Sequence, residues 1–254
     1  MKLTKPQIKA HAEAMALVDC GRPLKDDERE FILDNFHEGA TNINSAAGAF
    51  FTPRGLARDL AIEVNGGRVV DLCAGIGSLS YAVEQKVSGL VCIELNPEYA
   101  RIGKRIVPDA EWIVGSVFAP RSLGRFRWAI SNPPFGAIRA DGFTGKYTGS
   151  QFEYCVIELA SRMADFGCFI LPQMSAPFRL SGRQQYCREE TDKARKFREQ
   201  TGIEMEHGCG VDTSIYRNDW RGVSPICEIV VCEFERQSAP LSEDSQLALF
   251  GEAA

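Results

Sequence analysis

The sequence of 254 residues contains no hydrophobic run that approaches the roughly 20 residues needed by a membrane-spanning helix. Its N-terminal segment is interrupted by Lys9, Glu13 and Asp19, so it lacks the apolar core of a signal peptide. The absence of internal repeats and long low-complexity tracts argues against a solenoid, a collagen-like fibre or a coiled-coil rod. Hydrophobic residues make up 44% and charged residues 25%, which is typical of a globular chain. We expect one full domain with extensions.

No CxxC pair occurs among the nine cysteines. Several cysteines lie in apolar runs, which is typical of small buried thiols in a reducing compartment; these are Cys73, Cys92, Cys168, Cys227 and Cys232. We therefore expect a cytoplasmic protein. A zinc site built from Cys187, His207 and Cys209 is conceivable, but no ligand spacing supports it, so we predict no metal centre.

The chain also lacks an excess of positive charge, because 29 Lys and Arg residues face 34 Asp and Glu residues, for a net charge of −5. A protein that binds nucleic acid through bulk charge alone is normally basic, so this balance argues mildly against one. Cationic side chains nevertheless gather in residues 121–147 and 173–200. The charges in 188–199 also suit an ordinary solvated helix with paired charges four residues apart.

The order of apolar and polar segments predicts three regions. Residues 1–47 form a helical N-terminal extension and linker, residues 48–236 the main domain, and residues 237–254 a flexible tail. Short apolar segments alternate with helical ones in the main domain, which predicts a mostly parallel seven-stranded sheet that ends in an antiparallel hairpin. The predicted strands are 68–73, 90–95, 110–115, 127–132, 167–172, 203–208 and 226–234, and the predicted helices are 78–86, 97–106 and 152–165.

A glycine turn follows the first predicted strand, where Asp71 precedes Gly75 and Gly77. Glycines allow a tight turn and a close approach of the backbone to a ligand at the start of a helix. Ser80 stands where a dinucleotide fingerprint would place its third glycine. Glu94 ends the second strand, where it could accept both hydroxyls of a ribose. Either a nicotinamide or an adenosyl-methionine cofactor would satisfy this pattern.

The tetrapeptide Asn132-Pro133-Pro134-Phe135 follows the fourth predicted strand. Two prolines fix the backbone and leave carbonyl groups as pure acceptors. Asn132 Oδ1 and the Pro133 carbonyl could each accept one N–H of an exocyclic amine such as adenine N6, and Phe135 could stack on the base. A rigid Asn-Pro turn at a strand exit is the ordinary alternative. The position at the sheet edge shared with Asp71 and Glu94 favours the functional reading.

With these motifs the chain resembles the class I S-adenosylmethionine-dependent methyltransferases, specifically the DNA adenine-N6 group. The catalytic motif [DNS]PP[YFW] is matched by Asn132–Phe135, the glycine motif by residues 71–77 including Cys73, and the ribose-binding acid by Glu94. Phe51-Thr52-Pro53 matches a motif that packs over the methionine end of the cofactor and binds its carboxylate. The order of the motifs resembles the γ-type arrangement, and the resemblance covers residues 48–235. It implies a Rossmann-like fold.

Two departures from that family matter. Its usual Asp after the third strand is absent, so Ser116, in the segment that runs to Phe118, or a backbone N–H would contact the cofactor adenine. There is also no separate target-recognition domain, which predicts short or broad sequence specificity. We expect the phosphate contacts to come from the cationic stretches, at Arg139, Lys146, Arg179 and Arg183.

The resemblance implies transfer of a methyl group to adenine N6 in DNA. RNA or a protein glutamine amide is the alternative substrate, and a catalytically idle cofactor-binding module is a further alternative. The tail sequence Gln246–Phe250, QLALF, resembles the peptide by which bacterial replication proteins dock into the sliding clamp. Packing of this segment on the domain, or plain disorder, is the alternative interpretation.

Overall fold

The computed structural model describes residues 3–37, 50–119, 121–221 and 223–234. Two helices come first, α1 (Lys5–Val18) and α2 (Asp26–Asn35), as the periodicity of residues 3–37 predicts. Thr4 caps α1 with its side chain and, together with Gln7, forms a capping box. Three acidic residues in the first turn of α2 complement the positive end of that helix.

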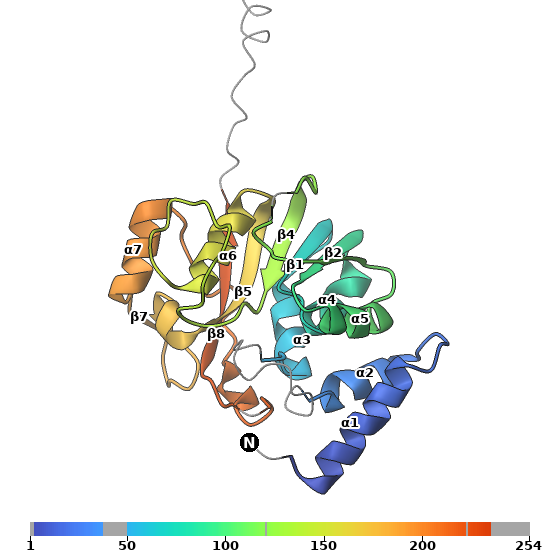
Figure 1. Ribbon diagram of the computed structural model, residues 1–254. Helices are drawn as coiled ribbons and strands as arrows, with labels where there is room; N and C mark the ends of the chain where they lie inside the picture. The colour runs from blue at the N-terminus through green and yellow to red at the C-terminus, as the bar shows by residue number, and fades with distance from the viewer. Residues whose placement is uncertain (1–2, 38–49, 120, 222, 235–254) are drawn as a thin grey trace, which may run out of the picture.

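A six-stranded sheet forms the centre of the described structure, in the order β3-β2-β1-β4-β5-β8 (Figure 1). Its members are β1 (Arg68–Leu72), β2 (Gly89–Glu94), β3 (Glu111–Val114), β4 (Phe126–Ser131), β5 (Ala164–Pro172) and β8 (Cys227–Glu233). Every pair is parallel except β5 with β8, which is antiparallel. The chain runs outward from β1 to β3 and then returns to the other side of β1 with β4. The order of the strands therefore reverses between β1 and β4.

Helices cover both faces of the sheet (Figure 1). One face packs against α3 (Arg54–Glu63), α4 (Ser78–Val83) and α5 (Pro97–Ile106), with α1 and α2 outside them. The opposite face packs against α6 (Phe152–Ser161) and α7 (Asp192–Thr201). Successive side chains of β1 point to opposite faces: Val69 packs in the core on the α3–α5 side, and Val70 packs in the core on the α6–α7 side. The prediction of a mostly parallel sheet between layers of helices is confirmed.

Two predicted elements differ from the structure, and one helix was not predicted. The segment 203–208 forms only an isolated bridge, Glu206 to Val231, so the sheet has six strands in the described residues and not seven. Its alternation is real, because Ile203 and Met205 are buried, but the chain turns away at Gly208. The predicted helix 152–165 ends at Ser161, and its last two residues open β5. Helix α3 was not predicted. The charged run 188–199 lies mostly in a helix, α7, as the alternative interpretation of that run expected.

A small antiparallel hairpin, β6 (Phe178–Arg179) with β7 (Cys187–Arg188), follows the carboxyl end of β5. Short 3₁₀ turns complete the structure, at η2 (Glu84–Lys86), η3 (Gln173–Ser175) and η4 (Thr213–Tyr216). No helix in the described parts of the chain is both long and apolar enough to cross a membrane. The tail 237–254, with the QLALF segment, lies outside the described residues.

Candidate active site at the carboxyl edge of the sheet

The predicted motifs meet where the strand order reverses. The glycine turn follows β1, Glu94 ends β2 and Asn132 follows β4. Because β1 pairs with both β2 and β4 in parallel, the carboxyl ends of all three strands lie at one edge. Open α/β sheets bind their ligands at such a switch point.

The turn after β1 is built from left-handed backbone. Cys73 has φ 67°, Gly75 φ 58° and Gly77 φ 88°, and Gly77 is the N-cap of α4. Glycine adopts this region without the penalty that other residues incur. Cys73 is the one non-glycine residue with positive φ in the described chain. The turn thereby places the Gly75 N–H next to the end of β2, where the Glu94 carboxylate accepts its hydrogen bond.

Glu94 is held in place by backbone donors. The Gly75 N–H donates to Glu94 Oε2 at 2.7 Å, and the Asn96 N–H donates to Oε1 at 2.8 Å. The residue is 8% exposed, and burial raises the pKa of its carboxyl group. A carboxylate that is fixed in this way keeps lone pairs for hydroxyl donors on its open side.

Asp71 is buried beneath the same turn. Ser80 Oγ donates to Asp71 Oδ2 at 2.6 Å, whereas Asp71 Oδ1 is buried with no hydrogen-bond partner. Burial is the main cause that raises the pKa of Asp71 to about 7, and the charge of Glu94 adds to it. Sequence reasoning saw in Ser80 only a missing glycine. Its hydroxyl is in fact the donor that orients Asp71.

The Asn132 side chain has one defined orientation. Its Nδ2 donates to the Phe50 carbonyl at 3.0 Å and to Thr52 Oγ1 at 2.9 Å. Because a backbone carbonyl can only accept, the amide nitrogen must face Phe50. The opposite atom, Asn132 Oδ1, is buried and has no partner. An unpaired buried acceptor is unfavourable unless a ligand donor completes it.

Asn132 and Asp71 line the same small cavity, of about 30 Å³, which is room for little more than one water or one small polar group. Its other lining residues are Phe50, Phe51, Thr52, Cys73, Ala74, Gly75, Ser78 and Leu79. Two of the lining residues thus carry oxygens that lack a donor, and the cavity suits a cationic group or a neutral amine. The structure brings together the Phe51–Thr52 segment, the glycine turn and Asn132, as predicted.

The turn that follows Asn132 is tied to α6. The Gly136 N–H donates to Glu153 Oε2 at 3.0 Å, and the Gly136 carbonyl accepts from the Phe152 N–H at 3.0 Å. Glu153 is fully buried and also accepts from Ser175 Oγ at 2.7 Å. Pro133 is buried, and Phe135 packs half-buried against the core. Sequence reasoning missed Glu153, because a Glu in the first turn of a helix carries no signal of its contact with a distant loop.

Phe51 connects the site to the N-terminal helices. Its ring packs edge-on against Tyr99 of α5, at 5.1 Å between centroids, and against Phe36 at 5.4 Å. Phe36 is fully buried just after α2 and also contacts Tyr99 at 6.1 Å. The aromatic residue of the Phe-Thr-Pro motif is therefore supported by the N-terminal extension.

Ser116 and Phe118 follow β3, the strand that pairs with β2. Ser116 Oγ accepts from the Phe118 N–H at 3.2 Å, so the hydroxyl shapes its own turn. The Phe118 ring is 7% exposed and packs against Phe143 and Phe152, each at 5.3 Å between centroids. Phe118 is thus mainly a core residue.

The four predicted phosphate contacts are not brought together. Arg139 is exposed and forms an ion pair with Asp141 at 2.5 Å. Arg183 lies exposed in the turn between β6 and β7. Arg179 is 2% exposed, and its Nη1 donates to the carbonyls of Gln173, Ala176 and Phe178. This corrects the expectation for Arg179, since a buried guanidinium occupied by three carbonyls holds the chain and has no surface for a phosphate.

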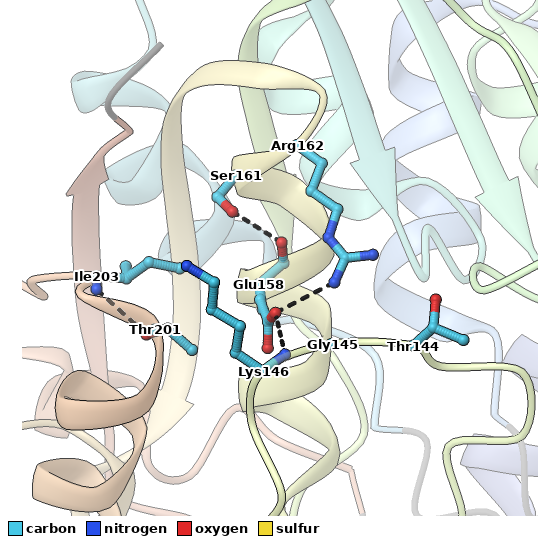
Figure 2. Close-up of a pocket in the computed structure, with 8 residues that line it drawn as sticks. All are labelled: Thr144, Gly145, Lys146, Glu158, Ser161, Arg162, Thr201 and Ile203. Atoms are coloured by element: carbon cyan, nitrogen blue, oxygen red, sulfur yellow. Dashed lines mark hydrogen bonds and ion pairs between the residues drawn. The ribbon is translucent and has the colours of Figure 1, made fainter. Parts of the chain in front are cut away.

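Lys146 lies in a separate, larger cavity of about 380 Å³ beside the second half of α6 (Figure 2). Its backbone N–H donates to Glu158 Oε1 at 2.6 Å, and Arg162 Nη2 donates to the same oxygen at 3.1 Å. The Tyr147 N–H donates to Glu158 Oε2 at 2.8 Å. The Glu158 carboxylate is thus already satisfied by the protein, unlike Asp71 and Asn132. The switch-point cavity is therefore the better candidate for catalysis.

No protein-family model matches the sequence, and no curated protein matches it either. Solved structures do resemble it. A proposed class I S-adenosylmethionine-dependent methyltransferase from Listeria monocytogenes is similar at TM-score 0.59 and 13% identity, over 91% of this chain and 74% of that chain. A proposed RNA methyltransferase from Pyrococcus horikoshii is similar at TM-score 0.52 and 17% identity, over 91% and 99%.

A type I restriction-modification system methyltransferase subunit from Streptococcus thermophilus is similar at TM-score 0.56 and 14% identity, over 84% of this chain and 49% of that chain. Identities of this size show a shared fold and nothing finer. The strand order and the last antiparallel strand agree with this likeness. The chain has the Rossmann-like fold of the class I methyltransferases.

Proposed function

We propose that the protein transfers a methyl group from S-adenosylmethionine to the N6 amino group of adenine in DNA. The observation that carries this proposal is the buried and unpartnered Oδ1 of Asn132. The Nδ2 group of the same amide donates to the Phe50 carbonyl and to Thr52 Oγ1 and so fixes its orientation. The amide lies at the carboxyl edge of a class I methyltransferase fold, in the motif Asn-Pro-Pro-Phe. An acceptor in this position is stabilised when a ligand supplies a donor, and the amino group of adenine can supply one.

The residues at the switch point fit the cofactor. Glu94 would accept the ribose hydroxyls, and Asp71 Oδ1 would face the positively charged methionine end. Phe51 and Thr52 border the same cavity, and Ser116 follows the neighbouring strand. When bound, the cofactor supplies an electrophilic methyl group on a sulfonium. The known neighbours described as S-adenosylmethionine-dependent or as methyltransferases support this assignment.

The protein's part in the reaction is to hold and expose the target amine. Asn132 Oδ1 and the Pro133 carbonyl each accept one N–H, which draws the nitrogen lone pair out of conjugation with the base. Phe135 supplies a face for the base. No protein base is required for the attack, because the methylated nitrogen becomes acidic and loses its proton to water.

Three of the predicted phosphate contacts are exposed, Arg139, Lys146 and Arg183, and of these Arg139 already forms an ion pair with Asp141. Arg183 is the best candidate for a phosphate contact, because its hairpin follows the carboxyl end of β5 and is held by hydrogen bonds to a buried carboxylate. The buried Glu228 accepts from the Leu180 N–H at 2.9 Å and from Ser181 Oγ at 2.8 Å. We propose that this hairpin contacts the strand next to the target base.

RNA is the second candidate substrate. The similarity to a proposed RNA methyltransferase, which this chain covers over 99% of its length, favours it. The Phe-Thr-Pro lead-in and the similarity to a restriction-modification subunit favour DNA. A restriction-modification setting is accordingly the biological context we propose.

Transfer of tritium from labelled S-adenosylmethionine to DNA, RNA and protein, measured in parallel, tests the proposal. We expect label in DNA as N6-methyladenine and a loss of at least 100-fold with Asn132→Ala, since loss of one preorganised polar contact in a reaction centre has an effect of about this size. Arg162→Ala, in the separate Lys146 cavity, is the control for folding. Label that enters only RNA or protein would overturn the assignment to DNA, and no transfer to any of the three would overturn methyl transfer.

We also propose that Gln246–Phe250 docks into a bacterial sliding clamp. The support is its sequence alone, because the segment lies outside the described residues. Gel filtration with purified clamp, with and without residues 246–254, tests it. Co-elution that requires these residues is expected, and unchanged elution of both proteins would end the idea.

A further inference from the structure

The link between Thr52 and Asn132 joins the two halves of the candidate site. Thr52 precedes α3 and Asn132 follows β4, 80 residues later in the chain, yet Asn132 Nδ2 donates to Thr52 Oγ1 at 2.9 Å. Thr52 is 8% exposed and lines the cavity shared with Asp71 and Asn132. Its hydroxyl oxygen is occupied as an acceptor, so its proton remains available for a ligand in that cavity.

The amide of Asn132 can be useful in only one of its two orientations. With Oδ1 toward the cavity it accepts a donor, and with Nδ2 toward the cavity it would repel an amine that offers N–H groups. The Phe50 carbonyl and Thr52 Oγ1 both accept from Nδ2, so they oppose the reversed orientation together. Removing one of these acceptors leaves a buried N–H unsatisfied and weakens that preference.

We propose that Thr52 is a positioning residue for the catalytic amide: it holds the Asn132 amide with Oδ1 toward the substrate amine, and its own hydroxyl proton meets the ligand in the cavity. Occupation of the cavity and orientation of the amide are thereby coupled through one hydroxyl group. This inference deepens the proposed function and rests on it for its kinetic test. It gives Thr52 a role in turnover besides the cofactor contact that the resemblance implies.

Replacement of Thr52 separates the two roles. Thr52→Val keeps the shape of the side chain and removes the hydroxyl, and Thr52→Ser keeps the hydroxyl. We expect Thr52→Val to lower kcat for methyl transfer about tenfold, the loss given by one buried hydrogen bond. Thr52→Ser should restore most of kcat. Thr148→Val is the matched control, because Thr148 is exposed and bonded to Gln200 away from the switch point.

A double-mutant cycle with Asn132→Ala shows whether the effect passes through the amide. If Thr52 acts by positioning Asn132, adding Thr52→Val to Asn132→Ala causes no further loss of kcat at saturating cofactor. If the two losses multiply, or if Thr52→Val raises the KM for cofactor and leaves kcat unchanged, the positioning role is overturned.

A measurement without turnover keeps this inference distinct from the proposed function. In protein labelled with ¹⁵N-asparagine, we expect the Asn132 side-chain amide protons to exchange slowly and to shift in Thr52→Val but not in Thr148→Val. This result would stand even if no substrate were methylated, in which case the proposed function alone fails. Exchange of the Asn132 amide in the wild-type protein at the rate of an exposed asparagine would overturn the contact itself.

Discussion

At the scale of single residues, the candidate site is defined by oxygens that lack donors. Asp71 Oδ1 and Asn132 Oδ1 are both buried and unpaired, while their partner atoms on the same side chains are bonded. Hydrogen bonds on one side of each group therefore direct the other side at the cavity. An unpaired buried oxygen is unfavourable, and a ligand donor or cation at this position stabilises it.

Asp71 makes the stability of the protein depend on pH. Its pKa is raised to about 7 in the folded state, chiefly by burial, above the value of about 3.9 in an unfolded chain. Between these values the unfolded chain loses a proton that the folded protein keeps, so the free energy of unfolding falls as pH rises toward 7. Above pH 7 this loss is complete.

Asp71→Asn should remove that dependence. Urea unfolding of both proteins at pH 5.5 and pH 8 should show the variant gaining on the wild type by on the order of 1–2 kcal/mol over this interval. Ser80→Ala is the companion variant: it removes the hydrogen bond that lowers the Asp71 pKa, so the fall in the free energy of unfolding should extend to higher pH. A constant difference between wild type and Asp71→Asn across this range would contradict the prediction.

At the scale of elements, the junction between β1 and α4 determines how close a ligand can approach. Gly77, the N-cap of α4, has φ 88°, and a Cβ atom there would lie 3.3 Å from the Trp112 ring. A side chain at this position therefore meets both an unfavourable backbone region and a tight contact. Trp112 lies in β3, so the junction is packed against the outer strand of the sheet.

Gly77→Ala should lower the free energy of unfolding by about 1–2 kcal/mol, the penalty of a left-handed non-glycine residue. It should also weaken cofactor binding, because α4 begins at the ligand. Gly202→Ala is the matched control: Gly202 has φ 74° with no neighbour within 4 Å of a new Cβ, and it lies at the end of α7. Calorimetric titration with S-adenosylmethionine should find weaker binding only in Gly77→Ala, and equal binding by both variants would refute the role of this turn.

At the scale of the whole molecule, the N-terminal helices support the ligand site. The fully buried ring of Phe36 contacts Phe51 and Tyr99, and Arg221 donates to the carbonyls of Leu33 and Phe36 at the end of α2. The extension is thereby attached both to the Phe-Thr-Pro segment and to the loop before β8. It packs behind Phe51, which lines the cavity, and so supports the site from outside.

Phe36→Ala should lower the free energy of unfolding by about 3–5 kcal/mol, as for other buried aromatic residues. Among the variant molecules that stay folded, the substitution should also weaken cofactor binding, because the Phe51 ring loses its contact with the Phe36 ring. Leu33→Ala, which empties a buried position on α2, just before Phe36, without a ring contact to Phe51, should lower stability and leave affinity unchanged. Cofactor affinity should be measured for both variants well below their melting temperatures. An equal loss of affinity in both would contradict a specific role of the Phe36–Phe51 contact.

The sequence alone located the six strands of the main sheet, the sheet edge and the motifs. Apolar runs such as 68–73 and 90–95 can only be satisfied inside a covered sheet, and parallel strands deliver their following residues to one edge. The glycine turn, Glu94 and Asn132–Phe135 were therefore located from local patterns. The same patterns misjudged the end of α6 and the strand at 203–208, because those boundaries depend on which neighbour the backbone meets.

Only the tertiary structure decided how the side chains are used. Folding places backbone carbonyls beside Arg179, so its guanidinium bonds them and not a phosphate. Folding also places Asp71 beside Ser80, which makes the Ser80 hydroxyl a hydrogen-bond donor to that carboxylate. The orientation of the Asn132 amide is set by the Phe50 carbonyl, 82 positions away in the chain. Hydrogen bonds between residues this distant leave no periodic trace in a sequence, because only packing of the sheet against α3 brings the two partners within reach.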